Sequence, residues 1–335
     1  MLTFTLRRLL LAIPTLLVIS LVIFLLVDLA PGSPLSQIPL TVPPDVRQKM
    51  IEALGADQPV MFRYVLWLRQ FFWVEPMNLF DGWFGTHIVE GEQRILSWQS
   101  RSPVFSIIGE RIPQTLIVIG TAYLVGILIA LPIGIYSAYR QYSLFDQIGT
   151  LFAMIGFSVP TFFSGTLFII IFSVWLGWFP TKYDTTLEVT DWATFLEQIK
   201  QMILPVMTLG LANAASISRY MRSSMLDNMG MDYVRTARAK GLSERVVVLK
   251  HVLRNSLIPV VTVIALGIPS IFGGAIITEN LFGVNGIGAA LIGAIQASDI
   301  PMVQTLAFIF AVLIVLFNLI ADVLYGFLDP RIRYD

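Results

Sequence analysis

The sequence predicts an all-α polytopic membrane protein with six transmembrane helices, and three observations lead to that class. Hydrophobic residues occupy 56% of the 335 positions and charged residues only 13%, with a mean hydropathy of +0.76, whereas a soluble domain needs more charge to cover its surface. Six charge-poor runs are each long enough to cross a bilayer, which takes about 20 helical residues. No short-period repeat or low-complexity segment is present, so solenoid and barrel architectures have no support.

Each charge-poor run is expected to form one transmembrane helix. The runs are Leu9–Leu29, Gln114–Tyr139, Gln147–Thr181, Gln201–Ser218, Asn255–Thr278 and Ile300–Ala321. The first is predicted to be a permanent anchor, because its apolar stretch exceeds the roughly 7 to 15 residues of a signal peptide. As one straight helix the third would be about 52 Å long, against a hydrocarbon core of about 30 Å, so it must tilt, break or leave the membrane. Pro160 lies near its middle and is the expected break.

The distribution of Lys and Arg predicts that both termini are cytoplasmic. With the N-terminus inside, 13 of the 22 basic residues lie on the cytoplasmic side, eight of them in the loop 219–254. Seven of the nine on the other side fall in the long loop 31–113, whose charges carry little topological weight. The comparison of short loops is therefore 13 basic residues against two, Lys182 and Lys200.

The runs divide the chain into three regions by chain order. Residues 1–30 hold the cytoplasmic N-terminal end and the first helix, and residues 31–113 form an extracytoplasmic loop subdomain. Residues 114–335 form a core that contains the other five helices and the cytoplasmic loop 219–254.

The extracytoplasmic loop is expected to contain short helices. Asp45 can cap a helix over 46–54, and residues 60–72 carry apolar side chains at helical spacing. Aromatic residues are dense in its second half: Trp67, Phe71, Phe72, Trp73, Phe80, Trp83 and Phe84. Two interpretations stay open, namely helices that lie on the outer membrane face and aromatic side chains that simply pack beneath the loop.

Several kinds of chemistry find no support in the sequence. There is no Gly-Lys dipeptide, so the chain has no phosphate-binding Walker loop and is not expected to bind ATP or to hydrolyse it by that route. The two histidines, His87 and His251, are far apart, cysteine is absent, and no metal or catalytic triad is predicted. The acidic residues Asp28, Glu279 and Asp322 fall near span ends, where structural roles are expected, so a proton-driven or sodium-driven carrier is disfavoured.

The loop between the fourth and fifth runs is the remaining candidate for function. Tyr233–Lys240 is composed mostly of good helix formers, and Gly241 supplies the left-handed residue that commonly ends a helix. Ser243 is predicted to cap a second helix, with Lys250 and Arg254 near its C-terminus, where they would complement the helix dipole. A short rigid helix of this kind can insert into a groove of a partner protein. The alternative is a solvated positive loop without a partner.

The residues of this loop resemble the EAA loop of importer permeases of the ABC class. The family pattern is Glu-Ala-Ala, three residues, Gly, nine residues, and Ile-x-Leu-Pro. Ala237 and Gly241 agree with it, whereas Arg235 and Thr236 replace the acid and the first alanine, and Arg254 replaces the proline. The sequence from Asp232 onwards is similar to the sequences of the dipeptide, oligopeptide and nickel permease subfamily.

The same resemblance extends over most of the chain. It is carried in order by the opening Arg-Arg-Leu-Leu, Ala30-Pro-Gly-Ser-Pro, Gly82-Trp-Phe-Gly, the run from Glu279 to Gly288, Asp299-Ile-Pro-Met-Val-Gln and Leu328-Asp-Pro-Arg. The long loop after the first helix is similar to the first of the two permease subunits, the peptide permease B type. Residues Thr86–Pro103 do not match and are interpreted as an insertion of unknown role.

The resemblance implies a type I ABC importer permease fold and a set of partners. They are a second homologous permease, two cytoplasmic ATPase subunits that use ATP and Mg, and an extracytoplasmic substrate-binding protein, in a prokaryotic cell membrane. Lipid surrounds the chain, and neither nucleic acid nor a bound cofactor is expected. The residues implied to couple to the ATPase are Asp232, Tyr233, Arg235, Thr236, Ala237, Arg238, Lys240, Gly241 and Leu242.

Candidate residues of the substrate pathway are Ser158, Pro160, Asn213, Gly267 and Pro269. For each of them ordinary helix packing is the alternative. A pathway with few charges suits cargo recognised by backbone groups and shape, and di- or oligopeptides are the first expectation. Nickel chelates, glutathione and oligosaccharides remain open as cargo, and an ATP-independent channel or carrier is a more distant alternative.

Overall fold

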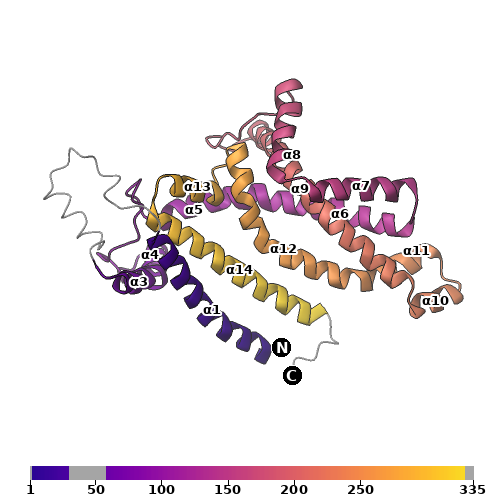
Figure 1. Ribbon diagram of the computed structural model, residues 1–335, viewed down its shortest axis with the longest axis horizontal. Helices are drawn as coiled ribbons and strands as arrows, with labels where there is room; N and C mark the ends of the chain where they lie inside the picture. The colour runs from indigo at the N-terminus through magenta and orange to yellow at the C-terminus, as the bar shows by residue number, and fades with distance from the viewer. Residues whose placement is uncertain (1, 30–57, 329–335) are drawn as a thin grey trace. The chain divides into compact units, whose positions relative to one another are not determined.

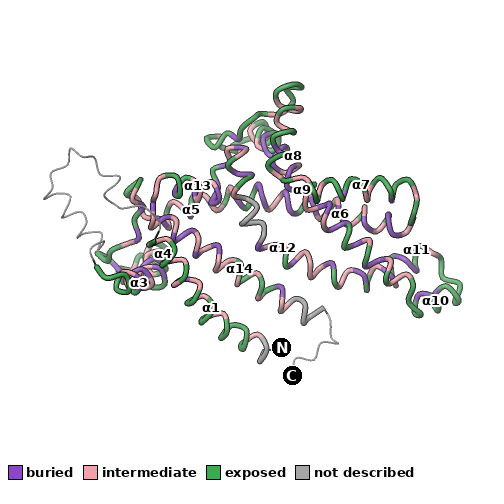
Figure 2. The backbone as a smooth tube through the Cα atoms, in the orientation of Figure 1, coloured by how far each residue is buried: buried purple, intermediate pink, exposed green. Residues whose placement is uncertain are grey.

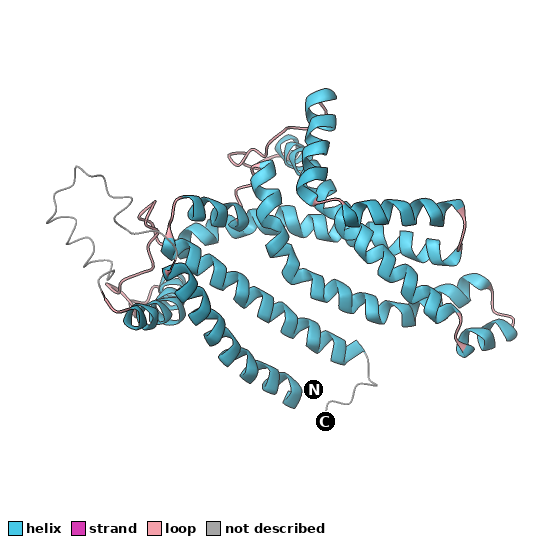
Figure 3. Ribbon diagram, viewed as in Figure 1, coloured by secondary structure: helices cyan, strands magenta, loops and turns pink. Residues whose placement is uncertain are grey.

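The computed structural model describes the backbone of residues 2–29 and 58–328, and the side chains of these ranges apart from 2–4, 270–275 and 324–328. All regular elements in the described ranges are helices (Figure 3). The helix expected over 46–54 lies outside the described residues.

The helices follow one another along the chain as labelled in Figure 1. The first half contains α1 (Leu2–Asp28), α3 (Val60–Arg69), η2 (Gln70–Val74), α4 (Glu75–Phe84), α5 (Val104–Thr115), η3 (Leu116–Gly120), α6 (Thr121–Tyr139) and α7 (Leu144–Ser158). The second half contains α8 (Thr161–Phe168), η4 (Ile169–Trp175), α9 (Trp192–Met229), α10 (Asp232–Ala239), α11 (Glu244–Val246), η5 (Val247–Val252), α12 (Leu253–Phe282), α13 (Ile287–Gln296) and α14 (Ile300–Leu328). Each η element is a π-helical stretch that continues its neighbours without a break, so 60–84, 104–139 and 244–282 are continuous helices.

The predicted fold class, an all-α polytopic membrane protein, is confirmed. In the described residues five helices are long and apolar enough to cross a membrane: Thr5–Asp28, Val104–Tyr139, Trp192–Met229, Glu244–Pro269 and Ile300–Val323. Two bent pairs add to them, α7 with α8–η4 at 107° and the end of α12 with α13 at 86°. The first pair is the long third run, which breaks at Pro160 as predicted.

The described chain forms two compact units that do not follow chain order. One comprises residues 1–9, 114–288 and 314–335, and the other comprises residues 10–113 and 289–313. They are described below as the first and second unit. The division into 1–30, 31–113 and 114–335 stays a prediction.

The core of the first unit is the contact between α6 and α9, where buried residues concentrate (Figure 2). A Cβ at Gly126 would lie 2.9 Å from the carbonyl oxygen of Gly210, and one at Gly134 would lie 2.6 Å from the Cβ of Met221. The two backbones can therefore approach closely only because these positions lack a side chain. Gly210 and Ala214 on α9 have the four-residue spacing of small residues that is typical of such contacts, but this spacing alone does not identify the glycines on α6.

Two buried carboxylates fix helix ends in the first unit. Glu279 accepts hydrogen bonds from the Thr115 hydroxyl at 2.6 Å and from the backbone N–H of Gly288 at 2.8 Å, so it holds the turn between α12 and α13. Asp146 forms a bidentate ion pair with Arg222 at 2.6 and 2.8 Å, which ties the start of α7 to α9. These are the structural roles that carboxylates at span ends commonly have.

In the second unit the helix 60–84 packs one face against the end of α1 and against α14. Tyr64 hydrogen-bonds Ser20 at 2.8 Å and makes an edge contact with Phe24 of α1. Trp67 and Phe71 contact Phe308 of α14. Packing therefore accounts for the aromatic residues on this face of the helix.

Residues 86–103, hereafter the anchored segment, are held to the second unit by three carboxylates. Asp81 accepts hydrogen bonds from the Thr86 hydroxyl and from two backbone N–H groups. Glu75, wholly buried, pairs with Arg94 at 2.6 Å and accepts the N–H of Ile95. Asp299, at the start of α14, accepts bonds from the Ser97 hydroxyl and the N–H groups of Trp98 and Gln99. The segment without a sequence interpretation is thus a firmly attached part of the unit.

Candidate functional site: the α10 helix-glycine-helix

α10 is held against the first unit by two apolar side chains on one face. Val234 is completely buried and Ala237 nearly so, and both belong to a cluster that includes Met221 and Met225 of α9 and Val248 of η5. The spacing of three residues places Val234 and Ala237 on the same side of the helix. Sequence reasoning assigned Ala237 to the partner-facing set, but the structure places it on the inner face, and it missed Val234, which the same spacing could have indicated.

The glycine prediction is confirmed in detail. Gly241 has φ +76°, in the left-handed region. Its N–H donates to the carbonyl of Arg238 at 2.9 Å, and the N–H of Leu242 donates to the carbonyl of Ala237 at 3.4 Å. This pair of bonds is the Schellman motif, which satisfies the last carbonyls of a helix. A Cβ at Gly241 would meet nothing within 4 Å, so glycine is required by the backbone conformation and not by lack of space.

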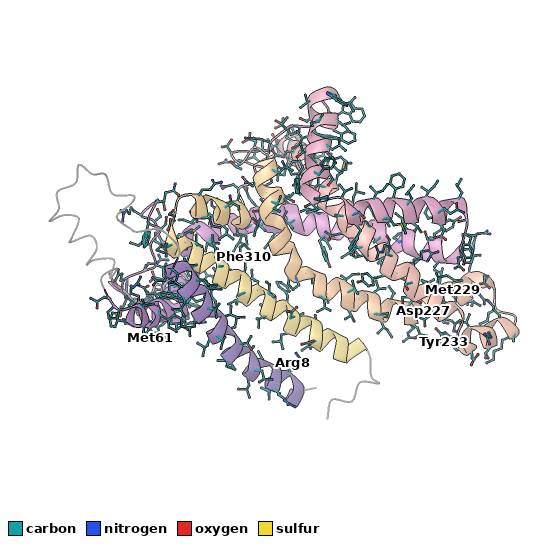
Figure 4. The ribbon with its side chains drawn as sticks, viewed as in Figure 1. Arg8, Met61, Asp227, Met229, Tyr233 and Phe310 are labelled. Carbon is teal, nitrogen blue, oxygen red and sulfur yellow. The ribbon has the colours of Figure 1, made fainter. Side chains whose placement is uncertain are left out.

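The opposite face of α10 presents charged and polar groups to solvent. Asp232, Tyr233, Arg235, Thr236, Arg238, Lys240, Gly241 and Leu242 are all exposed. Figure 4 shows Tyr233 near the end of α9, and its hydroxyl donates to the Oδ1 atom of Asn228 at 2.7 Å. Eight of the nine predicted coupling residues therefore lie on one accessible surface.

Two ion pairs arrange the charges of this face. Arg238 reaches across the glycine turn to Glu244 at 2.7 Å, and this hydrogen bond raises the pKa of the Arg238 guanidinium above its ordinary value. Arg235 pairs more loosely with Asp232 at 3.3 Å, and its side chain remains 73% exposed. Exposed pairs of this kind contribute little to stability, about 0 to 1 kcal/mol, so these side chains are available to a partner at small cost.

The prediction of a separate, short second helix was wrong. Ser243 occupies the N-cap position but its side chain makes no capping hydrogen bond. The helix that begins at Glu244 continues through α11 and η5 into α12 and ends at Phe282. Lys250 and Arg254 therefore lie within a long helix and cannot complement the dipole at its end. No glycine or proline separates the basic stretch from the apolar run, so nothing in the chain stops the helix there.

A polar clasp joins the two helices on either side of α10. The Ser224 hydroxyl donates to the carbonyl of Ser256 at 2.8 Å, and the single proton of the Ser256 hydroxyl is shared between the carbonyl of Val252 at 2.9 Å and that of Ser224 at 3.1 Å. Both hydroxyls are buried, where such bonds are not weakened by competing water. These bonds connect α9 directly to α12. Neither serine was singled out from the sequence.

The five predicted pathway residues belong to the α7–α8 bend, to α9 and to α12. Ser158 and Pro160 are exposed at the bend between α7 and α8, and Asn213 is half-buried on α9. On α12, Pro269 is buried and Gly267 lies beneath the Tyr123 hydroxyl, which donates to the carbonyl of Ile264 at 2.5 Å. Asn213 and Gly267 lie against neighbouring positions of α6, Gly126 and Tyr123.

Among the described residues of the first unit, α6, α7, α8, η4 and α9 form a cavity of about 820 Å³ that includes none of the predicted pathway residues. Its polar lining residues include Ser164, Thr208 and Ser218. Each of their hydroxyls donates to a carbonyl of its own helix. The cavity is therefore apolar in character. Among the residues that the structure describes, no group of three His, Cys, Asp or Glu side chains could hold a metal ion.

The comparisons with known proteins agree with this architecture. The family described as "Binding-protein-dependent transport system inner membrane component" matches residues 130–334. Its N-terminal counterpart, "Binding-prot-dependent transport system membrane comp, N-term", matches residues 1–119, a range that includes the anchored segment. The fold and these matches define the class: the chain belongs to the binding-protein-dependent transport system inner membrane components and is a multi-pass permease subunit of an ABC importer.

Individual relatives are similar over their whole length. The chain is 38% identical over 338 residues to the "Oligopeptide transport system permease protein AppB" of Bacillus subtilis (strain 168), covering 100% of both chains. It is 37% identical over 338 residues to the "Glutathione transport system permease protein GsiC" of Escherichia coli (strain K12), again covering 100% of both. A solved structure, "Crystal structure of an amino acid ABC transporter with histidines", shares the fold with a TM-score of 0.50 at 12% identity, over 66% of this chain and 94% of that chain.

Proposed function

We propose that this permease imports di- and oligopeptides and is driven by ATP hydrolysis in partner subunits that contact α10. The proposal rests on the observation that α10 has one buried and one exposed face. One face is anchored in the apolar cluster, and the other presents eight exposed residues beside a glycine turn. Because the Ser224–Ser256 clasp joins α9 to α12, a force applied to the exposed face moves two spans at once.

The proposed complex contains further subunits. They are a second homologous permease, two cytoplasmic ATPases that use ATP and Mg, and an extracytoplasmic binding protein that delivers cargo. This chain binds no cofactor in the proposal, and both of its termini lie in the cytoplasm of a prokaryotic cell. The names of the relatives support a transport system, and the excess of basic residues in the short loops on one side supports the orientation.

A charge reversal on the exposed face tests the coupling surface. We expect Arg235→Glu to lower co-purification of the ATPase by roughly tenfold, because it replaces an attractive rim charge by a repulsive one. Arg140→Glu is the matched control, since Arg140 is exposed in the turn between α6 and α7. Equal co-purification of both variants, at normal yield in the membrane, would show that α10 is not the contact surface.

Removal of the turn gives a second test. Proline fixes φ near −65°, whereas Gly241 requires φ +76°, so Gly241→Pro should displace Leu242 and abolish ATPase association while membrane insertion remains intact. Co-purification of the ATPase with this variant at normal yield would contradict the proposal. The chain purified alone is also expected to show no nucleotide hydrolysis, which a phosphate-release assay on a preparation free of other subunits checks.

The cargo is the least constrained part of the proposal. Relatives at 38% and 37% identity bear the names oligopeptide and glutathione transport permease, so glutathione, itself a modified tripeptide, is the second candidate. Mass spectrometry of the ligand bound to the cognate binding protein distinguishes the two. Recovery of a nickel chelate or an oligosaccharide, with no peptide, would overturn the peptide proposal without affecting the coupling proposal.

A further inference from the structure

The helix 60–84 carries two apolar faces, and only one of them is covered within the second unit. Tyr64, Trp67, Phe71 and Val74 face inwards and are buried. The other face carries Met61, Val65, Phe72, Leu79 and Trp83 at spacings of four and seven residues, and all five are exposed. Among the exposed residues of this fully described helix only Arg69 is charged, and it is paired with Glu92 at 2.6 Å.

An exposed stripe of this size requires an explanation. Single apolar residues on a surface are ordinary, but contiguous apolar patches mark a protein or a membrane contact. The stripe is rich in aromatic side chains, and Trp83 is 80% and Trp73 51% exposed. Tryptophan is enriched at the boundary between hydrocarbon and water, because its ring is amphipathic.

The contacts of the inner face set the depth of the helix. Arg63 pairs at 2.7 Å with Asp28, the last residue of the α1 span, and Tyr64 hydrogen-bonds Ser20. Ser20 and Asp28 are separated by about 12 Å along a helix that rises 1.5 Å per residue. The first turns of α3 therefore lie against the outermost part of a span that crosses the hydrocarbon region.

The direction of the helix 60–84 also agrees with a position at the outer end of α1. In Figure 1, α3 and α4 are seen nearly end-on beside the end of α1, whose length lies in the plane of the picture. The helix therefore runs across the end of the span and not alongside it. Met61, labelled in Figure 4, lies on α3 at this end of α1.

We propose that the helix 60–84 lies in the bilayer boundary at the Asp28 end of α1, with its exposed apolar stripe bound to lipid. The apolar side chains reach the top of the acyl chains, and Trp73 and Trp83 sit at the level of the headgroups. This is the position of an interfacial helix with its apolar face about 5 to 10 Å into the acyl boundary. The proposal depends only on α1 being a span, and so it is independent of the coupling mechanism and of the cargo.

Tryptophan quenching tests the proposal on the full chain in phosphatidylcholine vesicles. Single-tryptophan variants, with phenylalanine at the other six positions, retain Trp83, Trp73, Trp67 or Trp98. With lipid brominated near the top of the acyl chain, Trp83 and Trp73 should lose emission by roughly twofold, and lipid brominated near the chain end should quench them less. Buried Trp67 should respond neither to brominated lipid nor to aqueous iodide. Trp98, in the anchored segment, should respond more to iodide.

Two outcomes would overturn the proposal. If iodide quenches Trp83 and Trp73 as strongly as Trp98, the stripe faces water. If neither iodide nor brominated lipid quenches them, a second copy of the chain covers the stripe. Should the tryptophan-depleted chain fail to fold, Trp83→Phe and Trp73→Phe are compared with the unmodified chain, and each variant should lose part of the lipid-quenchable emission.

Discussion

α10 and the anchored segment are both short connections held firmly to a helical unit, but opposite kinds of contact hold them. α10 is attached by Val234 and Ala237, which pack into an apolar cluster, and it keeps its charges outside. The anchored segment is attached by Asp81, Glu75 and Asp299, which accept hydrogen bonds from its backbone and side chains.

The difference has a physical consequence. Apolar packing is non-directional and tolerates a small sliding movement, whereas buried charge-assisted hydrogen bonds require fixed geometry. α10 is therefore suited to transmit a displacement, and the anchored segment is suited to stay in place. Substitutions in the anchored segment and at α10 should therefore lower the free energy of unfolding by different amounts.

The largest effect is expected at Glu75. Glu75→Ala leaves the buried N–H of Ile95 and the partly buried Arg94, whose side chain is 26% exposed, without their partner, and loss of a pair whose carboxylate is wholly buried costs about 3 kcal/mol. The free energy of unfolding in detergent should fall by that amount. Glu92→Ala is the control, since it breaks the exposed pair with Arg69, and should cost about 0 to 1 kcal/mol. Similar losses for the two variants would show that the segment is not held by Glu75.

A smaller effect is expected at Val234. Val234→Ala removes two methyl groups from the cluster under α10 and should lower the free energy of unfolding by about 2 kcal/mol. Val246→Ala is the matched control, because Val246 is 39% exposed, and should change it by less than about 0.5 kcal/mol. If both variants unfold at the same denaturant concentration, the apolar anchor of α10 is not a significant contact.

The two regions also differ in how far the sequence predicts them. Gly241, the helix before it and the span break at Pro160 rest on local rules of backbone conformation, and each was predicted correctly. The contacts of Asp299 with Ser97 and Trp98 join residues about 200 positions apart. No local pattern in one sequence encodes such a pairing, so the anchored segment resembled an unexplained insertion.

The errors near α10 have the same origin. Lys250 and Arg254 suggested a helix end because basic residues are favoured in the last turn of a helix. A helix ends only where the following residues cannot continue it, and here the apolar run after Arg254 remains helical. Likewise, Gly210 and Ala214 indicated a close contact without identifying Gly126 and Gly134 as the partners on α6. The residue types on a helix face predict that the face will pack, but the partner helix is determined by the fold.

Gly241→Ala, in the turn after α10, is expected to lower the free energy of unfolding moderately. A non-glycine residue in the left-handed region costs about 1 to 2 kcal/mol, and a Cβ there meets no neighbour, so the loss is purely conformational. Gly230→Ala is the control, because Gly230 has φ −83° and alanine adopts that conformation without strain. Equal stability of the two variants in denaturant titrations would contradict the role assigned to the turn.

The smallest effect is a pH dependence confined to the anchored segment. The hydrogen bond from Thr86, followed by those from the N–H groups of Ile88 and Val89, holds the pKa of Asp81 below its ordinary value of 3.8. Because the folded-state pKa is lowered, this stabilisation is fully present above pH 3.8 and is lost as the pH falls below it. Hydrogen exchange of the amides of residues 86–90, corrected for its intrinsic pH dependence, should lose protection below that value. In Asp81→Asn the same amides should show no such transition. A transition that persists in Asp81→Asn would mean that a different group holds the start of the segment.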